Sequence, residues 1–292
     1  MIKYEITSDI NKEIPKERKN MAYQIIVLDL DGTLTNSKKE ITPKTKEALM
    51  RIQKEGKTVV LASGRPTPGV LPLAEELELE KYGGYILSFN GAKIINCRTK
   101  EVVYNKTVPE EYVKHLYDYA VKMNIGILSY TESGIVLGNG KDKYNELEAR
   151  INHLPMQEVH NFVEYIDSPE NKFLMTGEPK QIFDAQKEPR EQFGARLNIF
   201  RSEPFFLEIM PPEIDKAYSL GKLLAFLGED KSHMICCGDG FNDLSMIQFA
   251  GLGVAMENAQ KEVKEAADFI TYSNDEDGVC HVVNKFMLGI EE

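Results

Sequence analysis

Apolar runs alternate with amphipathic stretches near the start of the chain. Ile25–Leu28 is an uninterrupted apolar run, which is typical of a parallel strand covered on both faces. Thr42 can cap a following helix that has Pro43 at its first position and Gly56 at its end. Lys57–Ala62 then predicts a second strand. The pattern therefore indicates a strand-helix-strand unit.

The alternation of predicted strands and helices continues to Phe89 and is found again beyond Pro211. Val70–Leu79 predicts a second helix and Tyr85–Phe89 a third strand. Beyond Pro211 the predicted elements are a helix with a leucine stripe closed by Gly228, a strand at Met234–Cys237, and helices at Asn242–Ala250 and Ala259–Ala267. We predict an α/β protein whose core is a doubly wound, Rossmann-like parallel sheet built from both ends of the sequence.

The middle of the chain has a different pattern, with shorter and more closely spaced strands. Strands are predicted at Lys93–Cys97, Val102–Tyr104, Ile125–Tyr130, Ile135–Leu137, Val159–Ile166, Phe173–Met175, Leu197–Arg201 and Phe205–Ile209. Helices are predicted at Pro109–Met123, Lys141–Asn152 and Pro179–Phe193. The predicted organisation is an N-terminal extension at 1–20, a core at 21–91 and 210–292, and an inserted α+β cap at 92–209.

Composition restricts the partners of the protein. The hydrophobic fraction of 42% is enough for a proper core, and the net charge of −11 argues against binding a nucleic acid backbone. The first twenty residues lack the apolar run of a signal peptide, and no run of about 18 apolar residues occurs. We expect a soluble, cytoplasmic protein that binds neither nucleic acid nor membrane and is a monomer or small homo-oligomer.

The four cysteines indicate no disulfide framework or metal site. They contain no C-x-x-C pair, and adjacent Cys236 and Cys237 cannot form an ordinary disulfide; the others are Cys97 and Cys280. We expect reduced thiols that behave as small apolar side chains.

Polar residues follow directly after the predicted strands. Ligands of open parallel sheets bind beyond the carboxyl ends of the strands, so these positions are candidates for a site. They are Asp29 and Asp31, Ser63-Gly64-Arg65, Asn90-Gly91, and Gly238-Asp239-Gly240 with Asn242 and Asp243.

Several carboxylates at one sheet edge would repel one another unless a cation lay between them. Ligands that offer only oxygen, with room for water, favour Mg²⁺. One aspartate can then bind the ion and attack phosphorus, while the other holds a proton for the leaving oxygen. Taken singly, Asp31-Gly32 is an ordinary turn signal, and Ser63 or Asp243 could cap a helix. Three successive strand ends carrying such residues favour a site.

The sequence resembles the haloacid dehalogenase-like hydrolases, in particular the Cof-type sugar phosphatases with an α/β cap. The resemblance covers residue 23 to the C-terminus. It rests on Asp29-Leu30-Asp31-Gly32-Thr33-Leu34, Ala62-Ser63-Gly64-Arg65, Asn90-Gly91-Ala92, Lys216 after Glu208-Ile209, Gly238-Asp239-Gly240-Phe241-Asn242-Asp243, and Val254-Ala255-Met256.

The resemblance implies a Mg²⁺-dependent phosphomonoesterase that passes through an aspartyl-phosphate. Asp29 would be the nucleophile and a metal ligand. Asp31 would be the acid and base, with its backbone carbonyl on the ion. Asp239 would bind the metal, and Asp243 would support or bind it. Lys216 would offset the charge of the phosphate and of Asp29.

Other motif residues would contact the phosphate or the substrate. The resemblance implies this for Ser63, and for Asn242 it implies a contact with either the phosphate or Asp239. We extend substrate contact to Leu30, Gly64 and Arg65. Arg65 could instead orient its own loop through a salt bridge. Lys216 lacks the flanking glycines that are common in the family, and a solvated lysine at a helix start is the alternative for it.

The predicted cap would act as a lid. Its hinges would lie near Asn90-Gly91 and Met210-Pro211-Pro212, and closing it would exclude water. Asn171-Lys172 and Glu208 stand at strand ends of the cap, where they face either the substrate or the ordinary protein surface.

The expected substrates are small phosphorylated metabolites, with sugar phosphates foremost. Two other functions stay open: a phosphomutase of the same superfamily, and a regulator that carries a phospho-aspartate without hydrolysing it. Asp31 argues against the regulator, since an acid and base two residues from the nucleophile speeds hydrolysis.

Overall fold

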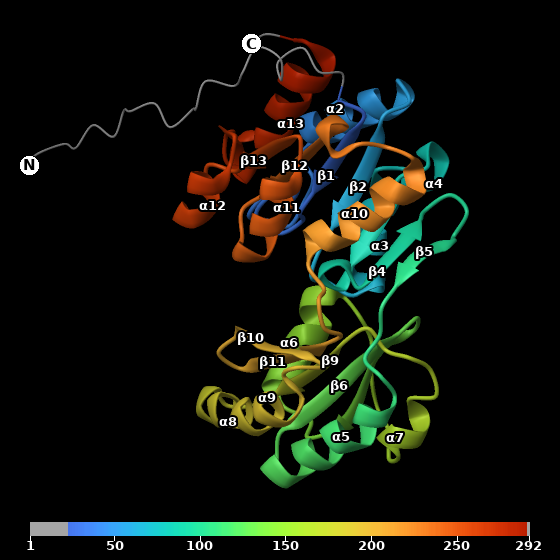
Figure 1. The fold of residues 1–292 in the computed structure, drawn as a ribbon, viewed down its shortest axis with the longest axis vertical. Helices are drawn as coiled ribbons and strands as arrows, with labels where there is room; N and C mark the ends of the chain where they lie inside the picture. Colours follow the sequence, from blue (N-terminus) through green and yellow to red (C-terminus); the bar gives the residue numbers. More distant parts are fainter. Residues whose placement is uncertain (1–22, 291–292) are drawn as a thin grey trace, which may run out of the picture. The chain divides into compact units, whose positions relative to one another are not determined.

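The computed structural model describes residues 23–290, which form two compact units (Figure 1). The first unit consists of residues 23–62, 77–85 and 224–290, and the second of residues 63–76 and 86–223. Each unit therefore joins segments that are far apart in the sequence. The predicted extension at 1–20 lies outside the described residues, and the predicted domain boundaries stay predictions.

The first unit contains a parallel sheet. Its strands run in the order β14-β13-β12-β1-β2, with every neighbouring pair parallel. Their bounds are β1 (Ile25–Leu28), β2 (Thr58–Ala62), β12 (Met234–Gly238), β13 (Leu252–Ala255) and β14 (Phe269–Ile270). All four residues of β1 are buried, as the apolar run predicts for a strand covered on both faces. The predicted α/β class with a parallel sheet is confirmed.

Helices of the first unit begin and end where local signals place them. Thr42 accepts a hydrogen bond from the Thr45 backbone N–H at the start of α2 (Pro43–Lys54), and Gly56 after its end has a φ of +86°. The other helices are α4 (Leu79–Tyr82), α11 (Leu244–Phe249), α12 (Lys261–Ala266), α13 (Gly278–Val282) and a π-helical turn at Val283–Leu288. Helices α13 and α2 pack together although they lie far apart in the sequence (Figure 1).

The second unit contains a six-stranded sheet in the order β10-β11-β9-β6-β7-β8. Neighbouring strands are antiparallel except β7 and β8. The strands are β6 (Gly126–Thr131), β7 (Gly134–Asn139), β8 (Met156–Glu158), β9 (Phe173–Thr176), β10 (Asn198–Glu203) and β11 (Phe206–Met210). The antiparallel hairpin of β4 (Lys93–Asn96) and β5 (Val102–Asn105) also belongs to this unit.

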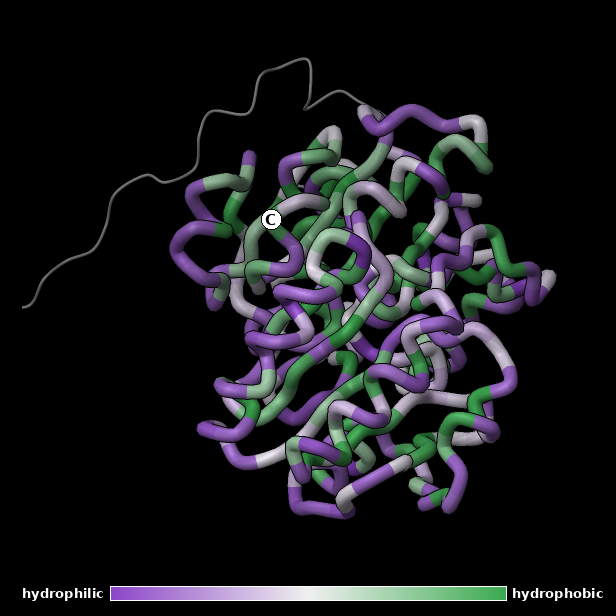
Figure 2. Tube along the Cα trace, turned by 60° about the horizontal axis from the view of Figure 1, so that its bottom comes forward, coloured by the Kyte–Doolittle hydropathy of each residue, from purple (hydrophilic) through white to green (hydrophobic). Residues whose placement is uncertain are grey.

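Two apolar clusters lie on the two faces of the six-stranded sheet. On one face, Ile127, Phe173 and Leu207 pack in a cluster with residues of the helices. These helices are α5 (Glu111–Met123), α7 (Phe162–Tyr165), α8 (Pro179–Ala185) and α9 (Lys187–Phe193). On the other face, Leu128 and Leu174 belong to a second cluster, next to α6 (Lys143–Asn152). Hydrophobic and hydrophilic stretches alternate along the chain, as Figure 2 shows. Elements that bury one face and expose the other require such an alternation.

Three predicted elements differ from the structure. Val159–Ile166 is not a strand, because Asn161 accepts a hydrogen bond from the Glu164 backbone N–H and starts α7. The predicted helix at Val70–Leu79 is replaced by α3 (Thr67–Glu76) and α4, with Glu78 between them at a φ of +51°. The predicted helix at Pro179–Phe193 is divided into α8 and α9. The third predicted strand is observed as β3 (Tyr85–Ser88), and the leucine-striped helix as α10 (Lys216–Leu227).

Two predictions from composition can be compared with the structure. All four cysteines are buried, in agreement with the expectation that they behave as small apolar side chains. Among residues 23–290, none of the helices is both long and apolar enough to span a lipid bilayer.

Candidate active site

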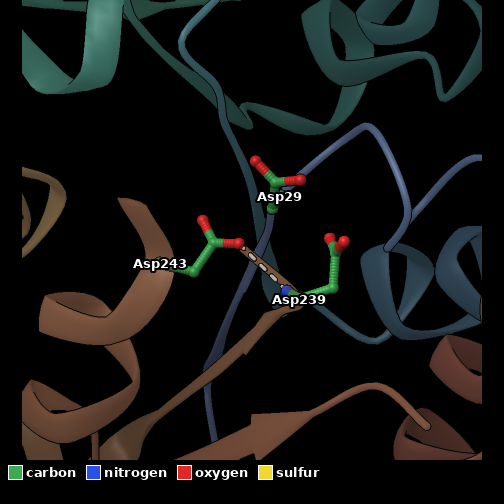
Figure 3. Close-up of side chains that lie close together, drawn as sticks. All are labelled: Asp29, Asp239 and Asp243. Atoms are coloured by element: carbon green, nitrogen blue, oxygen red, sulfur yellow. Dashed lines mark hydrogen bonds between the residues drawn. The ribbon is translucent and has the colours of Figure 1, made fainter. Parts of the chain in front are cut away.

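Three carboxylates meet at the carboxyl end of the parallel sheet in the first unit (Figure 3). One oxygen each from Asp29, Asp239 and Asp243 lies within 4.8 Å of the other two. Asp29 follows β1 and Asp239 follows β12, the neighbouring parallel strand. The backbone N–H of Asp29 donates to the carbonyl of Cys237 at 3.1 Å, which continues the ladder to the site. Strand pairing therefore explains why residues from distant motifs converge.

Asp243 holds the loop that carries Asp239. Its Oδ2 atom accepts hydrogen bonds from the backbone N–H groups of Asp239 at 3.0 Å and Gly240 at 2.9 Å. The side chain is buried, with an exposed fraction of 1%. Hydrogen bonds to a buried carboxylate are strong, so they fix the loop conformation after β12. The bond to Gly240 also caps the short helical turn at 241–243, as the capping alternative for Asp243 predicts. Its role in supporting a metal ion stays a prediction.

Gly32 and Thr33 contact Asp239 from the first motif. The Thr33 hydroxyl donates to Asp239 Oδ1 at 2.8 Å. Gly32 has a φ of +88°, and a Cβ atom there would lie 2.4 Å from Asp239 Oδ2. Only glycine fits at this close approach. Thr33 is not among the predicted site residues, although its place directly after Asp31-Gly32 in the motif is a signal.

The acidic group suits a hard divalent cation. Its potential ligands are all carboxylate oxygens, and such clusters repel themselves when no cation is bound. Mg²⁺ prefers this donor type and keeps several waters, so three carboxylates are a sufficient set. The residues present therefore fit the predicted ion.

Asp31 is not a member of this carboxylate group, which among the described residues consists of Asp29, Asp239 and Asp243. The predicted contact of its backbone carbonyl with the ion stays a prediction. Its Oδ1 atom accepts from Lys39 Nζ at 2.7 Å. Lys39 has a φ of +65° and stands in a tight loop whose backbone N–H groups are bound by the Asn36 side chain.

Lys39 is not among the site residues that the sequence predicts. It lies in a short run of polar residues that is typical of a solvated loop. The pair with Asp31 is partly exposed, with side-chain exposures of 60% for Lys39 and 36% for Asp31. Such a pair contributes little to stability, and its effect is to orient the Asp31 carboxylate.

In the second unit, hydrogen bonds join the other predicted motifs. The backbone N–H of Asn90 donates to the Ser63 carbonyl at 2.9 Å, and Phe89 N–H donates to the Arg65 carbonyl at 3.0 Å. The Ser219 hydroxyl of α10 donates to the Gly91 carbonyl at 2.7 Å. The strand-end segments at 63–65 and 89–91 and the start of α10 are therefore neighbours.

The structure rejects the alternative interpretations of Lys216 as a solvated lysine and of Ser63 as a helix cap. Lys216 begins α10 and has an exposed fraction of 0%, so the solvated-lysine interpretation is wrong. Ser63 is also buried, and its hydroxyl accepts from the Arg65 backbone N–H at 3.1 Å. Because α3 begins only at Thr67, Ser63 is not its N-cap residue.

The remaining predicted contact residues have different surroundings. Arg65 Nη1 donates to the Gly69 carbonyl at 3.3 Å, a contact that fits loop orientation. Leu30 is buried, and its carbonyl accepts from the backbone N–H and hydroxyl of Thr35. A Cβ atom on Gly64 would lie 3.1 Å from Asn90 Oδ1. Asn242 is exposed. Roles in substrate binding stay predictions for all four.

Comparisons with known proteins place the fold and the motifs in a family. The family model described as haloacid dehalogenase-like hydrolase matches residues 26–283. A solved haloacid dehalogenase-like hydrolase from Bacteroides thetaiotaomicron is 48% identical, with a TM-score of 0.88, and the match covers 90% of this chain and 99% of that one.

Relatives with curated names are similar over nearly their whole length. The Bacillus subtilis (strain 168) protein YxeH, provisionally named a phosphatase, is 34% identical over 278 residues, which is 91% of this chain and 99% of that protein. From the same organism, 5-amino-6-(5-phospho-D-ribitylamino)uracil phosphatase YcsE is 29% identical, over 93% of this chain and 99% of that protein. The predicted family resemblance is confirmed.

Proposed function

Since this chain belongs to the haloacid dehalogenase-like hydrolases, an enzyme family whose relatives are named phosphatases, we propose that it is a Mg²⁺-dependent phosphomonoesterase. Its proposed substrates are small phosphorylated metabolites, foremost sugar or polyol phosphates. The observation that carries the proposal is the convergence of Asp29, Asp239 and Asp243 within 4.8 Å. Asp29, Asp239 and Asp243 would hold the ion, together with the backbone carbonyl of Asp31. When bound, Mg²⁺ would offset the negative charge of the phosphate as it approaches the carboxylates.

The first half-reaction transfers the phosphoryl group to Asp29. A carboxylate oxygen of Asp29 forms a bond to phosphorus while the bond from phosphorus to the ester oxygen breaks. Asp31 gives its proton to the departing alkoxide, which is otherwise a poor leaving group. The products of this step are the free alcohol and an aspartyl-phosphate.

The second half-reaction restores the enzyme. Water attacks phosphorus, Asp31 takes the proton of that water, and the bond from phosphorus to the Asp29 oxygen breaks. Inorganic phosphate leaves. Asp29 is almost fully buried, with an exposed fraction of 7%, whereas the Asp31 carboxylate is partly exposed and accepts a hydrogen bond from Lys39, so the two acids have different surroundings.

The remaining motif residues of the sequence are proposed to bind the phosphate. Ser63 would donate a hydrogen bond to a phosphate oxygen, and buried Lys216 would offset charge on the phosphate and on Asp29. Weaker positioning contacts are proposed for Leu30, Gly64, Arg65 and Asn242. These assignments follow the sequence motifs, and the burial of Lys216 supports them, because a buried ammonium requires nearby negative charge.

The choice of substrate class has support from a relative. YcsE is named for a phosphate ester of a ribitylamino compound, which carries its phosphate on a polyhydroxy chain. A small, hydroxyl-rich alcohol is therefore the proposed leaving group here.

A phosphate-release assay tests the proposal. The purified protein is incubated with a panel of sugar and polyol phosphates, with Mg²⁺ and then with excess chelator. We expect turnover that the chelator abolishes, and none for Asp29→Asn. Glu262→Gln is the control, because Glu262 is an exposed acid on α12, outside the carboxylate group. Turnover that survives chelation would refute the mechanism, and a stable phosphoprotein without turnover would favour the regulator.

A further inference from the structure

The loop between β1 and α2 is bound by two segments from the other end of the chain. This loop, residues 31–42, contains both Asp31 and Lys39, and we call it the acid loop because Asp31 is the proposed acid and base. The two segments are residues 256–260, between β13 and α12, and residues 273–277, directly before α13. All three stretches belong to the first unit, so their contacts lie within one compact body.

Asn258 binds the acid loop next to Asp31. Its Nδ2 atom donates to the Gly32 carbonyl at 2.8 Å. Gly32 is the residue that approaches the Asp239 carboxylate closely, with a φ of +88°. The same segment also reaches the loop of Asp239, because the Gln260 backbone N–H donates to the Asp239 carbonyl at 3.0 Å. Asn258 therefore links the acid loop to the loop that carries a proposed metal ligand.

Asn274 extends this link from the second segment. Its backbone N–H donates to Asn258 Oδ1 at 2.9 Å, which orients the Asn258 amide so that Nδ2 faces the acid loop. Its own Nδ2 atom donates to the Thr35 carbonyl at 2.9 Å. Thr35 forms a short β-bridge with Asp31. The two asparagines thus bind the backbone of the residue after Asp31 and of its bridge partner.

Asp275 binds the part of the acid loop that carries Lys39. Its Oδ1 atom accepts from the Ser37 backbone N–H at 2.8 Å. Lys39 lies two residues further on, and its Nζ atom donates to Asp31 Oδ1 at 2.7 Å. The segment 273–277 therefore acts on the backbone near Asp31 through Asn274 and on the partner of the Asp31 carboxylate through Asp275.

Hydrogen bonds are needed here because burial does not fix this part of the acid loop. Residues 36–40 are exposed or half-buried. A general acid must lie within hydrogen-bond reach of the oxygen that receives its proton. A displacement of about 1 Å can lower a rate about 100-fold. Contacts that define the conformation of this loop therefore bear directly on the proposed proton transfer.

We propose that Asn258, Asn274 and Asp275 are positioning residues of the reaction. They hold the acid loop so that the Asp31 carboxyl group reaches the departing oxygen. They act through this loop and not through contact with the substrate. The inference rests on the proposed phosphatase function.

Two esters that differ in their need for a proton test the inference. Ribitol 5-phosphate, or the sugar or polyol phosphate that the wild type hydrolyses fastest, releases an alkoxide that needs the proton of Asp31. p-Nitrophenyl phosphate releases a stable phenolate that leaves without one. For Asn258→Ala and Asn274→Ala we expect kcat/KM for the alkyl ester to fall about 10- to 100-fold. For p-nitrophenyl phosphate we expect a fall of less than about threefold, because its departure does not depend on the acid.

A matched pair of substitutions at Asp275 separates geometry from charge. Asp275→Asn keeps an oxygen that can accept from the Ser37 backbone N–H, whereas Asp275→Ala does not. Both remove the same negative charge, so an effect of that charge on Mg²⁺ binding would be equal in the two variants. We expect Asp275→Asn to keep the wild-type ratio of the two kcat/KM values and Asp275→Ala to lower the value for the alkyl ester selectively.

Asn284→Ala is the control for the loss of an asparagine hydrogen bond in the first unit. Asn284 lies in the π-helical turn at 283–288, where its Nδ2 atom donates to Cys280 Sγ at 3.6 Å. This substitution should leave the ratio of the two esters unchanged. Melting temperatures verify that all variants are folded.

The outcomes distinguish this inference from the proposed function. Equal losses for the two esters, or a wild-type ratio in both Asn258→Ala and Asn274→Ala, would overturn the inference. If the wild-type protein hydrolyses no alkyl ester, the proposed function fails, and amide hydrogen exchange of residues 31–40 then decides whether the asparagines hold the acid loop. Faster exchange in Asn274→Ala than in Asn284→Ala would support this, and equal exchange would overturn it.

Discussion

The crowding of Asp29, Asp239 and Asp243 predicts an unusual result for Asp239→Asn. Substituting a hydrogen-bonded polar side chain normally destabilises a protein, but here we expect the metal-free variant to be more stable than the metal-free wild type. The asparagine amide removes one negative charge from the group. In the wild type the Thr33 hydroxyl donates to Asp239 Oδ1 at 2.8 Å, and the amide oxygen of the variant can still accept this hydrogen bond.

The magnitude follows from the spacing. Two charges 4.8 Å apart repel by about 3 kcal/mol at an effective dielectric constant of about 20. Asp239 takes part in two such pairs, and its partial exposure weakens both. We therefore expect the free energy of unfolding of the metal-free variant to rise by about 2 kcal/mol.

Bound Mg²⁺ should reverse the order of stabilities. Wild-type protein at a Mg²⁺ concentration of about 100 times its Kd gains about 2.7 kcal/mol. The variant has lost a ligand and should gain much less. Thermal melting at pH 8 in chelator, followed by a Mg²⁺ titration, measures both effects.

The control for this experiment is Glu262→Gln, which also removes one negative charge from the first unit but lies on α12, outside the carboxylate group. It should leave the Mg²⁺ response unchanged. An Asp239→Asn variant that melts below wild type in chelator, or that keeps the full Mg²⁺ response, would refute the idea that these carboxylates are built around a cation.

Two further predictions concern other positions. Burial raises the pKa of Glu170 from 4.5 to about 7, so the folded state favours the protonated acid. This stabilisation is complete below pH 4.5 and is lost as the pH rises through 7. At about 1.4 kcal/mol per pKa unit the loss is about 3.5 kcal/mol. Glu170→Gln should remove this part of the pH dependence of the melting temperature. Gly32→Ala should abolish activity and the Mg²⁺ response, because its Cβ would lie 2.4 Å from Asp239 Oδ2. Gly56→Ala, at a nearly equal φ of +86° with nothing within 4 Å, should cost only about 1 kcal/mol of stability and keep activity; equal effects of the two substitutions would contradict the clash.

Much of the fold could be predicted because its signals are local. The fully apolar run at Ile25–Leu28 is strand β1, and the Thr42-Pro43 start of α2 is where the cap and the fixed φ of proline place it. Val159–Ile166 was misread because a short apolar stretch fits a strand and a helix equally well. There, the Asn161 side chain decided for a helical turn.

The candidate site also has features that the sequence predicts and features that depend on tertiary packing. The sequence by itself determined which residue types stand after each strand, and hence that Asp29 and Asp239 would meet, because neighbouring parallel strands end at one edge. Only the tertiary structure decided that Asp243 binds the loop backbone, that Lys39 holds Asp31, and that Lys172 pairs with Glu208. Patterns along a chain report the conformation of each segment, whereas these contacts depend on side-chain directions and distances that are fixed only when separate segments pack.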